Sequence, residues 1–304
     1  MENQMMNGTE MTKQEKTRNL IEVIVVFAVA LVLLLIVSYG SAGLAQKDIL
    51  LNANVLMLVT EALMPLIGIG YLLVKKYDLI ENLGLHKIRV TTALWSVLLG
   101  LLVIPVTSFV NVLTQFLVPN TLVQASDSLI GNGAGSTLFI GAVAAPICEE
   151  LLFRGMIFHR LKISMKTIFA IILSALLFGI MHMNFNQLCY AAVLGLFFAY
   201  VDDICDSIYP SMIMHVVVNG LNLLLLVVVS AAMEMTGQDL GTAAEEARNS
   251  AQFGQTAIVY GILSIICILL MLPIFRHLRK IRAQENAQKT EEVLTQEEEQ
   301  SQES

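Results

Sequence analysis

Long runs without a charged residue limit what this chain can fold into. They cover residues 23–46, 90–126, 128–148, 167–201, 207–233 and 249–275. Each run reaches or exceeds the roughly 20 apolar residues that a helix needs to cross a bilayer. Only 14% of the 304 residues are charged and 56% are hydrophobic, which excludes an ordinary soluble domain. The sequence therefore predicts an all-α, polytopic membrane protein built as a helical bundle.

About eight transmembrane helices are expected. The run 167–201 would be about 52 Å long as one helix, against a hydrocarbon core of about 30 Å. We therefore expect it to turn back at Asn184–Gln187 and to supply two spans, the second of them short. The other spans are expected at 20–43, 55–74, 92–112, 138–158, 211–231 and 256–275.

Basic residues predict the orientation of the bundle. With both termini cytoplasmic, sixteen of the eighteen Lys and Arg residues lie on or near the inner side, and only Lys47 and Arg248 lie outside. We divide the chain into a cytoplasmic N-terminal segment (1–19), a transmembrane domain (20–275) and a charged cytoplasmic tail (276–304). The Glu- and Gln-rich tail lacks the apolar residues of a core, so we expect a solvated helix or disordered chain.

Ionisable side chains inside the fourth span need an explanation. Glu149, Glu150 and Arg154 lie in an otherwise apolar segment, where each costs about 2.5–3.5 kcal/mol on insertion scales. Such residues usually face a bundle interior or a water-filled cavity. Glu150 and Arg154 are four residues apart, which predicts a salt bridge along one helix face. Glu149 lies about 100° around the helix with no partner there, so its carboxylate is free for chemistry.

Two further spans carry pairs spaced four residues apart, which share a helix face. These are Phe178-x-x-x-His182 and His215-x-x-x-Asn219. Taken singly, a membrane histidine is more often a hydrogen-bond partner between helices than a catalyst, and Phe178 is a core residue by default. Glu61, in the second span, is another buried carboxylate with little weight on its own. The joint occurrence of a free carboxylate, two imidazoles and an amide on three helices favours a functional site.

These residue types can hydrolyse a peptide bond. A carboxylate and an imidazole can hold a water molecule and remove its proton, while a second imidazole and an amide donate to the developing oxyanion. Glu149, His182 and His215 could instead be three ligands of a catalytic zinc with an open position. The usual zinc-peptidase pattern H-E-x-x-H is absent.

The patterns E-E-x-x-x-R, F-x-x-x-H and H-x-x-x-N, in this order, resemble the motifs of the CAAX prenyl protease and bacteriocin-processing family of intramembrane endopeptidases. The resemblance covers about 138–226. It implies that Glu149 is the general base and that His182 helps it to hold the water. His215 and Asn219 would form the oxyanion hole. The supporting residues would be Glu150, Arg154 and Phe178.

This resemblance also implies a substrate and a location. The substrate would be a membrane-associated peptide or protein, prenylated or bacteriocin-like, and the catalysis glutamate-type or dependent on a metal such as zinc. We expect the protein in the cell (plasma) membrane, in contact with the lipid bilayer and with no nucleic acid, and its water-filled cavity open to the cytoplasm.

Two other functions remain open. A non-catalytic immunity or scaffold protein of the same fold is one, although all four polar positions are present. A proton-coupled transporter that uses Glu149, His182 and Glu61 as a relay is the other. Inverted repeats would favour the transporter, and the sequence has no evident ones.

Depth in the membrane sets a condition on the site. Counted at 1.5 Å per residue from the basic ends of the spans, Glu149 and His215 lie about 12–14 Å from the inner surface, and His182 about 22 Å. The side chains can meet only if the fifth span begins near Leu161 or the other expected boundaries shift.

Overall fold

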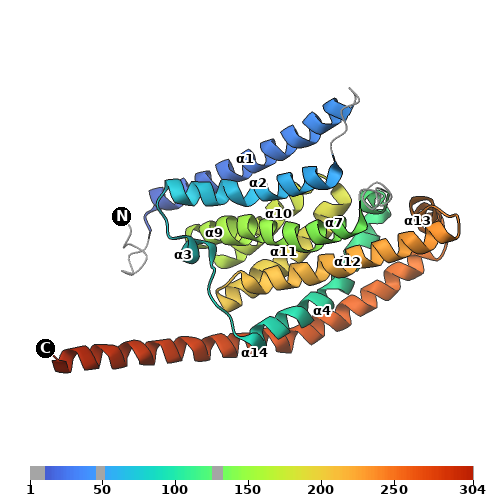
Figure 1. Cartoon of the computed structure of the whole chain (residues 1–304). Helices are drawn as coiled ribbons and strands as arrows, with labels where there is room; N and C mark the ends of the chain where they lie inside the picture. Colours follow the sequence, from blue (N-terminus) through green and yellow to red (C-terminus); the bar gives the residue numbers. More distant parts are fainter. Residues whose placement is uncertain (1–10, 46–51, 125–132, 304) are drawn as a thin grey trace.

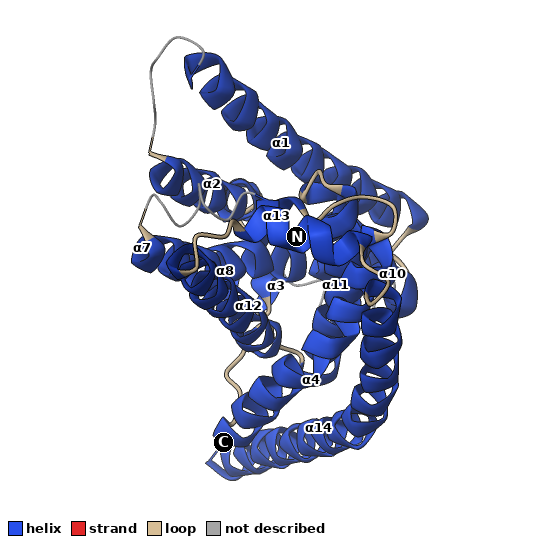
Figure 2. Ribbon diagram, turned by 90° about the vertical axis from the view of Figure 1, so that its right-hand side faces the viewer, coloured by secondary structure: helices blue, strands red, loops and turns tan. Residues whose placement is uncertain are grey.

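The computed structural model describes residues 11–45, 52–124 and 133–303, and all the regular elements in these ranges are helices (Figures 1 and 2). Seven helical segments are long and apolar enough to cross a membrane. The protein is thus a polytopic all-α bundle. The seven segments are α1 (Lys13–Ala45), α2 (Ala53–Val74), α4 (Val90–Gln115), a continuous run from Ala134 to Ser164, α11 (Phe185–Cys205), α12 (Tyr209–Met235) and α14 (Phe253–Glu303).

An eighth apolar helix, α10 (Thr167–Met181), is the short one of the bundle. With 15 residues it is about 22 Å long, less than a full crossing. The sequence predicted instead that the following span would be short, but α11 has 21 residues. The turn between them lies where it was predicted, since Asn184 caps α11 and accepts from the backbone N–H of Gln187.

Short helices mark the two ends of the bundle (Figure 1). At one end α3 (Leu79–Leu83) follows α2, whereas α5 (Thr121–Gln124) and α13 (Leu240–Asn249) pack together at the other. Gly84 ends α3 at a φ of 66°, which favours glycine. Its carbonyl accepts from the backbone N–H of Ile208 at 3.0 Å, so α3 docks on the turn between α11 and α12.

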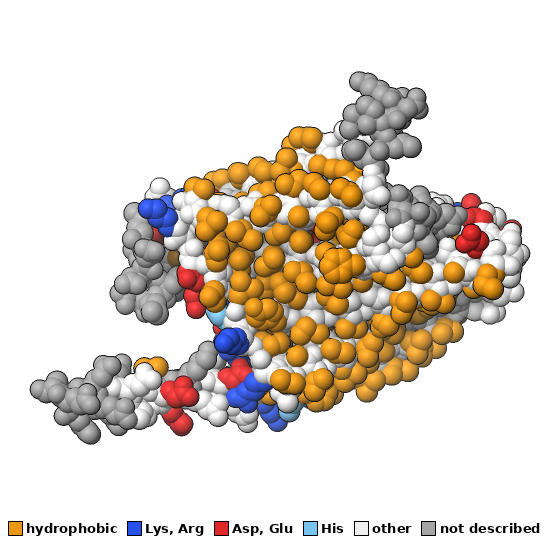
Figure 3. Space-filling view, viewed as in Figure 1, with side chains coloured by type: hydrophobic (Ala, Val, Ile, Leu, Met, Phe, Trp, Pro, Cys, Tyr) orange, Lys and Arg blue, Asp and Glu red, His pale blue; other side chains and the backbone are white. Residues whose placement is uncertain are grey.

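The run from Ala134 to Ser164 lies at the centre of the bundle. It packs against α2, α10, α11 and α12, and its residues 152–158 are all buried. The outer helices α1 and α14 instead expose apolar side chains such as Ile24 and Ile265. Apolar side chains cover the middle of the molecule, and charged ones gather at its two ends (Figure 3). This distribution is the one a bilayer requires.

The last helix continues far beyond the bundle (Figure 1). Helix α14 has 51 residues and passes without a break through Pro273 into the charged segment that begins at residue 276. The first part of this segment is anchored, because Arg282 pairs with Asp206, and Arg89 Nε lies 2.9 Å from Glu285 Oε1. The segment 276–304 is therefore helical through Glu303 and packs on the bundle near its start.

Gly179 allows α10 and α11 to approach closely, and we expect Gly179→Ala to separate them. A Cβ at this position would lie 2.6 Å from the Leu188 carbonyl oxygen and 3.1 Å from Ala192 Cβ. Overpacking of this kind costs about 1–3 kcal/mol. The matched control is Gly70→Ala on α2, where nothing lies within 4 Å. Thermal unfolding in detergent should show a lower midpoint for Gly179→Ala alone; equal midpoints would contradict the expectation.

Candidate active site

Two π-helical stretches flank the carboxylate pair of the fourth span. The central run consists of α7 (Ala134–Phe139), a π-helix (Ile140–Ala144), α8 (Ala145–Glu150), a second π-helix (Leu151–Phe158) and α9 (His159–Ser164). Such stretches occur often at functional sites, because they rotate side chains and free backbone groups. Glu149 and Glu150 therefore end a short α-helical segment between two irregular ones.

Glu150 and Arg154 form the buried salt bridge that the sequence predicted. Arg154 Nη1 donates to Glu150 Oε1 at 3.1 Å, and both side chains are 0% exposed. The guanidinium carbon lies 4.3 Å from the ring centroid of Phe178 and 5.1 Å from that of Phe198. The aromatic faces thus contact the rest of the cation. The supporting role expected for Phe178 would act through this contact.

His215 connects the carboxylate pair to α12. Its Nδ1 lies 2.8 Å from Glu150 Oε1, and its Nε2 lies 3.6 Å from Glu149 Oε2. Glu150 already accepts from Arg154, so its carboxylate is the acceptor and His215 donates from Nδ1. Nε2 is then directed toward Glu149. The sequence predicted the partner of Glu150 on its own helix and missed this one on another.

His182 is oriented by the end of α10. Its backbone N–H donates to the Gly179 carbonyl rather than to Phe178, which leaves the Phe178 carbonyl without its usual partner. The imidazole ring of His182 is the partner instead, because its Nδ1 lies 3.0 Å from the Phe178 carbonyl oxygen. Because a carbonyl only accepts, Nδ1 carries the proton and Nε2 presents a lone pair.

Asn219 is held by the first π-helix. The N–H of Ala145 donates to Ile140, five residues back, and Pro146 has no N–H to offer to Gly141. Asn219 Nδ2 donates to the Gly141 carbonyl instead, at 3.1 Å. Glycine permits this approach, since a Cβ there would lie 2.7 Å from Leu223 Cδ1.

All four residues with predicted catalytic roles line one cavity of about 570 Å³ inside the bundle. They are Glu149, His182, His215 and Asn219, and Phe178 lies beside them. From there the cavity reaches residues of α5 and α13, such as Val123 and Ala244. No Lys or Arg residue of the described chain lines it. The cavity extends toward the end of the bundle opposite α3 (Figure 1). In the orientation predicted from the Lys and Arg residues this is the outer end, so the expected opening to the cytoplasm stays a prediction.

Glu61 of α2 lines the same cavity. Its buried Oε2 has no hydrogen-bond partner among the described residues, and the same holds for Glu149 Oε2. The sequence gave Glu61 little weight, because its only signal was a carboxylate in an apolar helix. Its position relative to Glu149 depends on the packing of α2 against α8, which periodicity does not reveal.

The expected mismatch in depth disappears because the fourth span ends later than predicted. Its helical run continues to Ser164, 15 residues beyond Glu149, and His182 follows the start of α10 at Thr167 by 15 residues. The proposed start of the fifth span near Leu161 is therefore wrong. The turn before His215 docks on Gly84.

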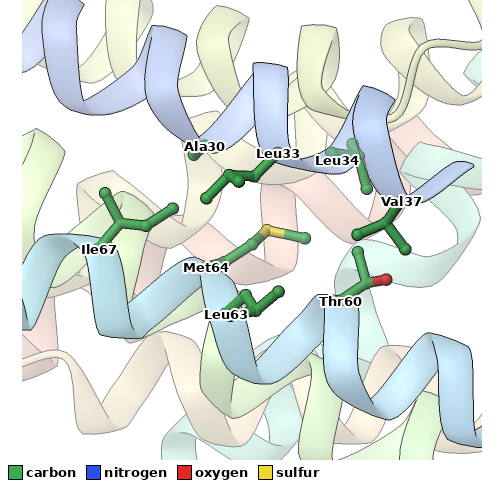
Figure 4. Close-up of a pocket in the computed structure, with 8 residues that line it drawn as sticks. All are labelled: Ala30, Leu33, Leu34, Val37, Thr60, Leu63, Met64 and Ile67. Atoms are coloured by element: carbon green, nitrogen blue, oxygen red, sulfur yellow. The ribbon is translucent and has the colours of Figure 1, made fainter. Parts of the chain in front are cut away.

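A second hollow lies between α1 and α2 and is lined by apolar side chains (Figure 4). Its volume is about 10 Å³, about enough for one water molecule. Thr60 is the polar residue in its lining, and the hydroxyl already donates to the Leu56 carbonyl at 2.8 Å. This hollow carries no catalytic group.

A zinc site made of Glu149, His182 and His215 does not fit this arrangement. In the described part of the chain, no three His, Cys, Asp or Glu side chains are grouped closely enough to hold a metal ion. Nδ1 of each imidazole donates within the protein and leaves Nε2 free, an arrangement that zinc-binding histidines share, so the spacing of the side chains is the argument against the zinc site. The chemistry that the geometry supports is proton transfer between carboxylate and imidazole groups.

Comparisons with known proteins give two matches. Residues 132–221 match the family model described as "Type II CAAX prenyl endopeptidase Rce1-like". The chain is also 28% identical over 82 residues to the "Putative membrane peptidase YdiL" of Bacillus subtilis. That match covers 27% of this chain and 34% of the relative, about a third of its length. No solved structure matches.

Proposed function

Residues 132–221 belong to the Rce1-like family of type II CAAX prenyl endopeptidases, as the three motifs suggested, and from this we propose that the protein is an intramembrane endopeptidase. Its substrate is a membrane-associated peptide or protein, prenylated or bacteriocin-like. One observation carries the proposal: the unpartnered carboxylate oxygen of Glu149 faces a cavity that two oriented imidazoles also line.

Glu149 is the general base of the proposed reaction. It takes a proton from a water molecule held between its carboxylate and Nε2 of His182. The hydrogen bond from Nδ1 of His182 to Phe178 keeps the lone pair on Nε2. A positioned base of this kind accelerates hydrolysis by about 10²–10⁴-fold. The mechanism is thus glutamate-type.

His215 and Asn219 stabilise the oxyanion in this proposal. The Asn219 amide has a second N–H besides the one given to Gly141. His215 donates from Nε2 when that nitrogen carries a proton, and the Glu150 carboxylate at Nδ1 then stabilises the imidazolium. A donor in an oxyanion hole contributes about 2.7–4 kcal/mol.

The lining of the cavity suits a peptide with aliphatic side chains. Apolar residues such as Leu194, Val218 and Leu226 line it beside the polar cluster, and an apolar pocket with a few directed polar groups is typical of ligand sites.

We propose the cell membrane as the location, with both termini in the cytoplasm, because that orientation agrees with the distribution of Lys and Arg.

A cleavage assay tests the proposal. Purified full-length protein in lipid nanodiscs is given a farnesylated CAAX peptide that carries a fluorophore and a quencher, and the same peptide without the farnesyl group. We expect release of the C-terminal fragment, identified by mass spectrometry, and faster cleavage of the farnesylated form. Intact peptide in both samples would overturn the proposal.

A proton-coupled transporter is the second candidate, because Glu61, Glu149 and His182 line one cavity. Proteoliposomes that contain a pH-sensitive dye separate the two functions. An endopeptidase leaves the internal pH unchanged when substrate is added outside, whereas a proton relay changes it. The non-catalytic scaffold predicts neither peptide cleavage nor proton flux.

A further inference from the structure

Glu61 lies outside the region that matches the family model, on a helix that the motifs do not include. Its helix α2 packs directly on α8 and on both π-helices of the fourth span. One face of α2, with Thr60 and Met64, contacts α1 (Figure 4). Met57 and Glu61 point the other way, into the large cavity.

The two cavity carboxylates come from helices α2 and α8, which pack on each other, and both line the same cavity. No Lys or Arg residue lines the cavity with them, and the one arginine near Glu149 is paired with Glu150. Two carboxylates without a cation between them repel each other when both are ionised, so the pair is most stable when it holds one proton.

Hydrolysis of an amide needs such a proton. The nitrogen that leaves the acyl carbon is a poor leaving group until it is protonated, and a second acid beside the general base supplies that proton in other hydrolases. Neither imidazole is as well placed to supply it. In the proposed function His182 directs a lone pair at the water, and His215 donates from Nδ1 to Glu150 and from Nε2 to the oxyanion.

Building on the proposed function, we propose that Glu61 is the general acid, which gives its proton to the amide nitrogen that leaves. The hydroxide part of water bonds to the acyl carbon, its proton goes to Glu149, and the C–N bond breaks as the Glu61 proton moves to nitrogen. The products are a carboxylic acid and an amine. A proton then returns from Glu149 to Glu61 through the cavity and restores the resting pair.

A pair of substrates distinguishes an acid from a base. The first is the farnesylated CAAX peptide, whose leaving group is an amine. The second is the 4-nitrophenyl ester of the same farnesylated acyl segment, whose leaving group departs as a stable anion and needs no proton. Loss of an acid therefore slows the peptide only, whereas loss of the base slows both.

We expect Glu61→Gln to lower kcat/KM for the peptide by about 10²-fold and to leave the ester within about threefold of wild type. Glu149→Gln should lose activity on both substrates. Glu61→Asp, which keeps an acid, should recover part of the peptide activity. The matched control is Thr60→Val, one residue away on the face toward α1, which should cleave both substrates at the wild-type rate.

Three results would overturn the assignment. The first is full peptide activity in Glu61→Gln. The second is an equal loss of activity on both substrates in that variant, which would indicate a structural effect or a role as base. A wild-type protein that cleaves neither substrate would overturn the proposed function and this assignment with it. If wild type cleaves both substrates but Glu61→Gln does not slow the peptide selectively, the protein is still an endopeptidase, and only the role of Glu61 as general acid is overturned.

Discussion

Glu149→Gln is expected to abolish peptide cleavage while the fold survives. Glutamine has nearly the shape of glutamate but cannot take a proton from water, so we expect kcat/KM to fall by about 10³-fold or more. The buried Oε2 of Glu149 has no hydrogen-bond partner among the described residues, so little native structure depends on its charge. The measurement is cleavage of the farnesylated peptide, together with thermal unfolding in the same detergent.

The control for this substitution is Glu234→Gln, an exposed carboxylate at the end of α12. It makes the same chemical change at a residue that does not line the cavity and should leave the rate unaltered. If Glu149→Gln turned over at the wild-type rate, the general-base role would be refuted, and the scaffold and transporter interpretations would gain.

Arg154→Met is expected to cause the largest loss of stability. The substitution leaves the Glu150 carboxylate in the core with His215 as its remaining hydrogen-bond partner. Removal of one member of a buried ion pair costs about 3–5 kcal/mol, because the other charge stays desolvated. The loss should appear in the free energy of unfolding, measured by denaturant titration in mixed micelles.

Lys162→Met, on the same helical run, is the matched control. Lys162 Nζ lies 2.8 Å from Asp203 Oδ1, but these side chains are 29% and 30% exposed. A partly exposed pair contributes about 0–1 kcal/mol, so this variant should remain close to wild type. Equal losses for the two variants would mean that burial of the Glu150–Arg154 pair has no special effect.

Much of the bundle could be predicted from the sequence because apolar length and charge determine it directly. The turn at Asn184 and the Glu150–Arg154 pair depend on local spacing, and both were predicted. The lengths of α10 and α11 were assigned the wrong way round. The acidic residues after 201 suggested an early end to α11, but Asp202 lies inside it and accepts from Ser211.

The parts of the site that could not be predicted depend on contacts between helices. The bond from His215 to Glu150 joins residues 65 positions apart, and Asn219 bonds to a carbonyl 78 positions away. The π-helical stretches shift the side chains from the 3.6-residue period on which the prediction relied. Glu61 gave only a weak signal, a carboxylate in an apolar helix, since its importance follows from the cavity it shares with Glu149.

The direction of the cavity decides which compounds can inhibit the protein. The cavity leads from the carboxylates toward α5 and α13, while α3 docks on the turn at Ile208 at the other end of the bundle. If the basic end faces the cytoplasm, an inhibitor that cannot cross the membrane should still act on whole cells. In sealed vesicles, the same compound should block activity from one face only.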